Sequence, residues 1–143
     1  MIKAIESAQC DIRMESYIFA ADEIGARFVA ALGAKARAGI DVRLHLDAFG
    51  AGQRGFRKFR REMESSGVRF RWFRPFRARH PLRYLQRNHR KLLVVDGREA
   101  FLGGFNIRRL NSRRLHGETR QRDTHVRVSG PLATLAIGHF DRL

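Results

Sequence analysis

Three polar residues near the middle of the chain have the types and the spacing needed to hold a phosphate group. His89 and Lys91 stand two apart at the start of one apolar run, and Asn106 ends the next apolar run after two glycines. Alternate residues of a strand point the same way and lie about 6.6 Å apart, so His89 and Lys91 can reach one group beyond the strand's end. The amide of Asn106 would add an N–H donor at the same place. We therefore expect an anion site built from imidazole, ammonium and amide.

The chemistry expected of this group takes place at the bound phosphate. An imidazole is a competent nucleophile or general acid near neutral pH. Lys91 and Asn106 would stabilise charge on the equatorial oxygens. Because Lys91 supplies the positive charge that a metal would bring, we expect neither a metal ion nor another cofactor. A His-x-Lys pair alone arises by chance, but its continuation into four apolar residues, Asp96 and Gly-Gly-Phe-Asn favours a functional site.

The elements that must position these residues alternate between strand and helix patterns. Such alternation predicts an α/β sandwich, with a mixed central sheet flanked by helices. The run Leu92–Val95 is apolar at every position, so its strand should be central and covered on both faces. Asp22 is suited to cap a helix and Pro131 to open one. Strands are predicted over 12–19, 41–47, 68–73, 89–96, 99–104 and 124–130, and helices over 22–39, 56–67 and 131–143.

Length and composition indicate a single globular domain over residues 1–143. Hydrophobic residues make up 43% of the chain, which excludes a disordered protein. No apolar run approaches the roughly 20 residues of a transmembrane helix, and charge interrupts the first residues too early for a signal peptide. The lone Cys10 excludes an internal disulfide and is typical of a reducing compartment.

The charge is strongly basic and concentrated in one stretch. The net charge is +15, and between Arg54 and Lys91 fourteen basic residues face two acidic ones. Such a field steers anions, for which the candidates are nucleic acid, an anionic membrane surface and phospholipid head groups. Residues 74–87 form a basic, aromatic loop in which we expect peripheral membrane contact. The arginines expected to make it are Arg74, Arg77, Arg79 and Arg83.

The remaining histidines carry weaker signals. His45 alternates within a strand and is expected to pack, and His125 follows Asp123 by two residues and could point into the site. His80 lies in the basic loop and could help to bind an anion. His116 and His139 are expected at the surface, and no histidine pair has zinc-ligand spacing.

The motif around His89 resembles that of a known superfamily. His89-x-Lys91, four residues, Asp96 and then Gly103-Gly104-Phe-Asn106 resembles the HKD motif of the phospholipase D superfamily. The surrounding stretches "MESYIFAADEIGARFVAALGAKARAGIDVRLHLDAFGA", "SSGVRFRWFRP", "RNHRKLLVVDG", "FLGGFNI" and "RDTHVRVSGP" are similar, in order, to the N-terminal half of bacterial cardiolipin synthases. The resemblance covers nearly the whole chain and implies the phospholipase D-like sandwich.

The resemblance assigns roles to individual residues. His89 would attack phosphorus to form a phosphohistidine, or would protonate the leaving alcohol. Lys91 and Asn106 would bind the phosphate. Asp123 in "RDTHV" falls where the family has an acid that orients the histidine. Asp96 either touches the chemistry or is structural, pairing with a nearby arginine.

Three neighbours of the motif are expected to line the substrate. Arg87 and Arg90 flank His89 and would contribute positive charge. Gly104 stands where some single-motif relatives carry a serine, so that a hydroxyl contact to phosphate is absent here.

The resemblance implies a site that takes two HKD motifs, whereas this chain has one. Either two copies pair, or the chain is half of a two-motif enzyme. We favour the second arrangement, because Met1 falls where relatives have an internal residue and Leu143 stops within an unfinished helix. The implied function is phosphodiester transfer on phospholipid at the cytoplasmic side of a bacterial membrane. The alternatives are a homodimeric, metal-independent endonuclease and a non-catalytic anion- or membrane-binding half-domain.

Overall fold

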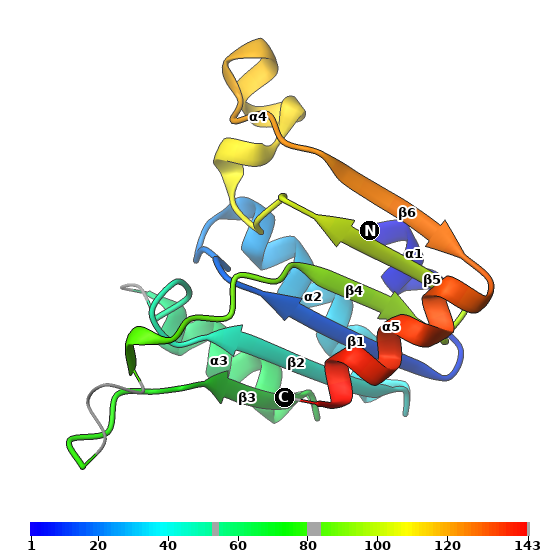
Figure 1. The fold of residues 1–143 in the computed structure, drawn as a ribbon, viewed down its shortest axis with the longest axis horizontal. Helices are drawn as coiled ribbons and strands as arrows, with labels where there is room; N and C mark the ends of the chain where they lie inside the picture. Colours follow the sequence, from blue (N-terminus) through cyan, green and yellow to red (C-terminus); the bar gives the residue numbers. More distant parts are fainter. Residues whose placement is uncertain (53–54, 80–83, 143) are drawn as a thin grey trace.

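A computed structural model describes residues 1–52, 55–79 and 84–142 and shows one six-stranded mixed sheet (Figure 1). The strand order is β3-β2-β1-β4-β5-β6. β1, β2 and β3 run parallel, whereas β4 is antiparallel to β1, β5 is antiparallel to β4, and β6 is antiparallel to β5. The strands are β1 (Asp11–Ser16), β2 (Asp41–Asp47), β3 (Arg69–Phe73), β4 (Leu92–Val95), β5 (Glu99–Gly103) and β6 (His125–Ser129).

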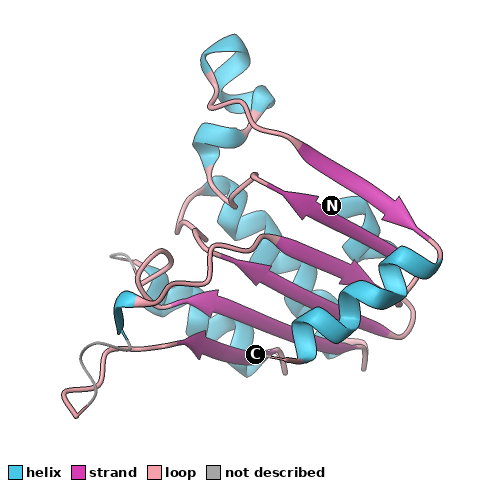
Figure 2. Cartoon of the chain, in the orientation of Figure 1, coloured by secondary structure: helices cyan, strands magenta, loops and turns pink. Residues whose placement is uncertain are grey.

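Helices cover both faces of this sheet (Figure 2). α1, α2 and α3 lie on one face and α5 crosses the other, so the predicted sandwich with a mixed sheet is confirmed. α4 belongs to an excursion that extends beyond one end of the sheet. The helices are α1 (Ile2–Ser7), α2 (Glu23–Arg37), α3 (Phe56–Ser65), α4 (Arg113–His116) and α5 (Pro131–Asp141).

The two faces bury cores of different size. The larger core lies between the sheet and α1 to α3, and contains fully buried side chains such as Phe19, Leu32 and Leu93. The smaller one lies under α5 and joins Phe140 to Val94. All four β4 residues are buried, with alternate side chains entering the two cores. β4 is therefore the central, doubly covered strand that its continuous apolar run predicts.

A local sequence signal accounts for the start of α2. Asp22 caps α2, because its Oδ1 accepts hydrogen bonds from the backbone N–H groups of Ile24 and Gly25 at 3.0 Å each. α1 was not predicted, and residues 107–122, for which neither a strand nor a helix was predicted, contain α4 and two 3₁₀ turns. β4 begins at Leu92 rather than at residue 89, because residues 89–91 are not paired with the neighbouring strands. His80 and Arg83, with their predicted contacts, lie outside the described residues.

Candidate active site

The predicted His89–Lys91 pair lies at the end of β4, with its two side chains in contact. Lys91 Nζ is 3.1 Å from His89 Nδ1 and donates to the His89 carbonyl at 2.7 Å. Lys91 is only 6% exposed, whereas His89 is open to solvent. The Tyr17 ring lies beside both, 4.6 Å from the imidazole centroid and 5.3 Å from Nζ. Tyr17 was not among the predicted site residues, because it follows β1 and reaches the site only in the folded chain.

The electrostatics of Lys91 suit an anion site. Burial lowers the pKa of its ammonium, the negative charge of Asp123 opposes this shift, and Arg108 adds to it. A poorly solvated ammonium interacts more strongly with an arriving anion than an exposed one does, because less water screens the charge. Lys91 can therefore bind a phosphate oxygen without a metal ion beside it.

Asn106 is tied to the loop that follows β1. Its Oδ1 accepts a hydrogen bond from the Ile18 backbone N–H at 3.1 Å, and two backbone bonds join Ile107 to Ile18 and Ala20. With the carbonyl oxygen engaged, the Nδ2 amide is the part of the side chain that can donate to a ligand. The segment from Tyr17 to Ala20 thus links Asn106 to the His89 side of the site.

Two buried carboxylates fix the backbone on either side of His89. Asp47, at the end of β2, accepts from the Asn88 backbone N–H at 3.0 Å and from Arg87 Nη1 at 3.2 Å. Glu15, in β1, accepts from Asn88 Nδ2 at 2.8 Å and from Arg90 Nε and Nη2 at 3.0 Å each. Both carboxylate side chains have no exposed surface. Sequence reasoning missed this pair, whose only signal was an acidic residue near the end of each apolar strand.

Arg87 and Arg90 were expected to bind substrate, but the structure gives their guanidiniums other partners. Besides Asp47, Arg87 lies 4.2 Å over the Tyr84 ring and donates to the Arg74 carbonyl. Besides Glu15, Arg90 donates to the His139 carbonyl at 3.1 Å. A buried carboxylate needs such a partner to offset its desolvation. Both arginines therefore position the His89 segment.

The surroundings of the Glu15 carboxyl shift its pKa in opposite directions. Burial raises its pKa, while the hydrogen bond from Asn88 and the charge of Arg90 lower it. The two-point contact with the Arg90 guanidinium has the geometry expected for an ionised carboxylate. Glu15 and Arg90 therefore form an ion pair.

Asp123 and Gly104 lie against each other. A Cβ built on Gly104 would overlap the Asp123 carboxylate, so the absence of a side chain leaves room for that group. Asp123 Oδ1 accepts from the Thr124 backbone N–H at 2.7 Å. Within the described part of the chain no hydrogen bond joins Asp123 to His89, and its charge acts on Lys91 instead. The expected orienting contact between Asp123 and His89 is not formed in this structure, and the missing side chain at Gly104 gives the Asp123 carboxylate its space.

Asp96 lies at the other end of β4 from Lys91. Its Oδ1 accepts from the backbone N–H groups of Cys10 and Asp11 at 2.7 and 3.0 Å, and its Oδ2 accepts from Gln9 at 2.9 Å. These bonds fix the turn that leads into β1. The structure therefore does not bring Asp96 to the phosphate-binding group, and its partners are backbone amides rather than an arginine.

The two strand histidines pack against aromatic rings. His45 stacks on Phe140 with centroids 4.3 Å apart, and His125 stacks on Phe105 at 5.4 Å. Burial is the main cause that lowers both pKa values, that of His45 to about 4. Among residues 1–52, 55–79 and 84–142, no group of three His, Cys, Asp or Glu side chains is arranged to hold a metal ion.

Comparisons with known proteins agree with this fold and motif. The family model described as cardiolipin synthase, PLD-like domain, matches residues 1–142. The chain is 38% identical over 141 residues to a cardiolipin synthase of Clostridium perfringens, covering 98% of this chain and 29% of that protein. It is also 38% identical to a cardiolipin synthase of Listeria innocua, covering 91% of this chain and 27% of the relative. The chain thus spans less than a third of the length of these relatives.

A solved structure shows the same fold. The phospholipase D family member Nuc from Salmonella typhimurium superposes with a TM-score of 0.71 at 23% identity, covering 99% of this chain and 82% of that one. The match of the family model over nearly every residue is the decisive observation. The chain therefore belongs to the cardiolipin synthase, PLD-like domain family of the phospholipase D superfamily.

Proposed function

We propose that this chain forms half of an active site that transfers the phosphatidyl group of a phospholipid. The observation that carries the proposal is the buried ammonium of Lys91, which contacts the exposed imidazole of His89 at the end of the central strand. A relative that is 38% identical to this chain over 141 residues is a cardiolipin synthase. The combination of a fixed cation and an accessible imidazole suits phosphodiester chemistry.

The reaction proceeds in two balanced steps. In the first, an imidazole nitrogen attacks phosphorus, a P–N bond forms, and the P–O bond to the leaving alcohol breaks as a second histidine protonates that oxygen. In the second, an acceptor alcohol loses its proton to that histidine and displaces the imidazole, which restores the phosphodiester; water in its place gives hydrolysis. His89 takes one of these two roles, while Lys91 and Asn106 hold the non-bridging oxygens. Neither step changes an oxidation state, so no redox partner is needed.

The second histidine comes from another HKD motif. One chain of this length covers 29% of a cardiolipin synthase relative, so the partner motif lies either further along a longer chain or in a second copy. Pairing in either form would place two imidazoles around one phosphate.

The substrate is expected in a membrane that the protein touches peripherally. No helix among the described residues is long and apolar enough to span a bilayer. Next to the His89 segment, however, Phe49, Phe76 and Leu85 are 60%, 64% and 73% exposed. The Tyr84 ring packs edge-on against both Phe49 and Phe76. Exposed aromatic side chains beside arginines suit the interface of an anionic bilayer, on the cytoplasmic side in our proposal.

The test of the proposal combines solution mass with activity. Light scattering gives the assembly state, and release of head group from phosphatidylglycerol vesicles, with and without EDTA, gives activity. His89→Ala should abolish turnover, whereas His139→Ala, which removes an exposed imidazole, should not. An active dimer would show that two copies complete the site, and an inactive monomer that gains activity when its other half is added would show a two-motif enzyme. Full activity in His89→Ala would overturn the proposal, and cleavage of DNA but not lipid in EDTA would favour the endonuclease.

Membrane contact is tested separately by vesicle sedimentation. Phe76→Ser combined with Leu85→Ser should weaken binding to vesicles containing phosphatidylglycerol by about tenfold, because two large apolar side chains are no longer transferred from water into the bilayer. Leu132→Ser, which changes a 62% exposed residue of α5, is the matched control. Equal binding by both variants would refute contact through this surface.

A further inference from the structure

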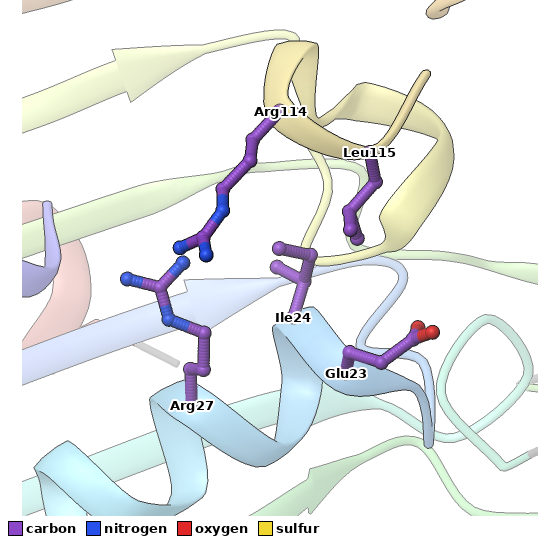
Figure 3. Close-up of a pocket in the computed structure, with 5 residues that line it drawn as sticks. All are labelled: Glu23, Ile24, Arg27, Arg114 and Leu115. Atoms are coloured by element: carbon purple, nitrogen blue, oxygen red, sulfur yellow. The ribbon is translucent and has the colours of Figure 1, made fainter.

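A hollow lined by both charged and apolar side chains lies beside α2. It has a volume of about 220 Å³ and lies between the first turns of α2 and the short helix α4 (Figure 3). The excursion that carries α4 is attached to α2, because the Arg109 backbone N–H donates to Asp22 Oδ2 at 2.6 Å. The lining residues are Glu23, Ile24, Arg27, Arg114 and Leu115.

Two arginines of this hollow face each other without an acidic partner. Figure 3 shows the guanidiniums of Arg27 and Arg114 pointing toward one another from opposite walls. In the part of the chain that the structure describes, no carboxylate pairs with either of them. Glu23 points away from both and pairs with Arg109 at 3.5 Å. Like charges that converge repel each other, and an anion placed between them would turn that repulsion into attraction.

The other side of the hollow is apolar. The side chains of Ile24 and Leu115 lie opposite each other, and Leu115 is 38% exposed. Arg27 also borders a neighbouring groove of about 540 Å³ between α1 and α2, where Ala30, Ala31 and Ala34 provide small apolar side chains. Ile2, Glu6 and Lys35 complete the lining of this groove. From Ile24 to Ala34 the helix rises about 15 Å, at 1.5 Å per residue. An apolar strip thus starts at the paired arginines and follows α2.

We propose that this hollow is an accessory site for the phosphate of a phospholipid. Arg27 and Arg114 would hold the phosphate oxygens from two sides, a geometry to which planar guanidiniums are suited. Ile24 and Leu115 would contact the apolar part of the same molecule. The choice of a lipid as the source of the phosphate rests on the proposed function. The excursion with α4 and residues 74–79 extend beyond the same end of the sheet, so one membrane surface can reach both (Figure 1).

Binding of a short-chain lipid tests the site apart from catalysis. The His89→Ala variant is used so that the lipid is not turned over during the measurement. The probe is dihexanoyl phosphatidylglycerol below its micelle concentration, and its binding is measured by calorimetry. Replacing both Arg27 and Arg114 by Gln should weaken its binding by about tenfold or more, since two charge-assisted contacts are lost. Arg113→Gln and Arg61→Gln together are the matched control with the same change of charge. Arg113 is 77% exposed and pairs with Glu118, outside the hollow.

A second variant separates the lipid from phosphate alone. Leu115→Gln should weaken binding of the lipid several-fold while leaving the affinity for inorganic phosphate unchanged. Equal affinity for inorganic phosphate and for the lipid would overturn the lipid assignment. Equal loss in the paired-arginine variant and its control would overturn the site itself, as would an arginine-dependent affinity for duplex DNA without one for the lipid. Because none of these measurements needs turnover, they are independent of whether His89 catalyses transfer.

Discussion

Glu15 and Arg90 form a two-point ion pair beneath the candidate active site. Arg90 Nε lies 3.0 Å from Glu15 Oε2 and Arg90 Nη2 lies 3.0 Å from Oε1. The Glu15 side chain has no exposed surface. Since the same carboxylate also accepts from Asn88 Nδ2, it holds both neighbours of His89. The backbone of His89 is therefore held in place by a carboxylate that the sheet buries, and only the His89 side chain is free to move.

Glu15→Gln tests this arrangement. The substitution leaves the Arg90 guanidinium, whose side chain is 39% exposed, without its counter-charge, so the free energy of unfolding should fall by about 1–2 kcal/mol. Transfer activity of the assembled enzyme should fall mainly in kcat, because His89 is displaced while the lipid still binds. Urea unfolding and steady-state kinetics measure the two effects. Glu64→Gln, which breaks an exposed pair with Arg60, is the control and should cost less than about 0.5 kcal/mol.

Lys91→Met should separate stability from activity. Removing an ammonium from a buried position relieves its desolvation cost, so the free energy of unfolding should stay the same or rise by up to about 1 kcal/mol. Activity should fall by about 100-fold or more, because no other described cation takes the place of Nζ beside His89. A stable variant that retains most of its activity would remove Lys91 from the proposed mechanism.

Gly104→Ala should damage the site through a steric effect. The new Cβ would overlap the Asp123 carboxylate and push it away from Lys91. We expect activity to fall by about tenfold or more, with the affinity for phosphate analogues reduced as well. Gly138→Ala is the matched control, since a Cβ there meets nothing within 4 Å and a helical alanine favours α5 by about 1 kcal/mol. Similar kinetics for both variants would contradict the contact.

Asp96→Asn should behave as a structural substitution. Asparagine tolerates the left-handed backbone of residue 96, whose φ is 52°, but it accepts hydrogen bonds less strongly than a carboxylate. Three backbone N–H groups at the entry to β1 lose part of their stabilisation, so the free energy of unfolding should fall by about 1–3 kcal/mol. The kcat of the folded protein should not change. A large loss of kcat without a loss of stability would show that Asp96 takes part in the reaction.

The buried ring of His45 should make stability depend on pH. Its pKa is lowered from 6.5 to about 4, chiefly by burial and then by Arg71. A lowered pKa means that the unfolded chain binds the proton more tightly, so the stabilisation is complete above pH 6.5 and is lost as the pH falls toward 4. Since the ring is partly exposed, the expected loss is about 1–2 kcal/mol after allowing for solvent screening. His45→Phe, which preserves the stack on Phe140, should flatten the unfolding free energy between pH 6.5 and 4; an unchanged slope would contradict this assignment.

Much of the fold and the centre of the site could be predicted from the sequence. The alternation of apolar and polar residues is a local property, and it places His89 and Lys91 together because side chains two apart in a strand share a direction. The all-apolar run before Asp96 likewise predicted the central position of β4. The cap at Asp22 and the turn at residues 96–97 are also local signals.

Only the tertiary structure decided which charges pair. Arg87 and Arg90 looked like ligands for an anion, yet Asp47 and Glu15 engage them from positions 40 and 75 residues away. Asp96 belongs to the same motif as His89, but β4 carries it to the opposite end of the sheet, onto amides more than 80 residues earlier. Hydrophobic periodicity fixes the direction of a side chain within its own strand. The partner of a buried charge depends instead on which strands become neighbours, and that order is set by the packing of the whole sheet.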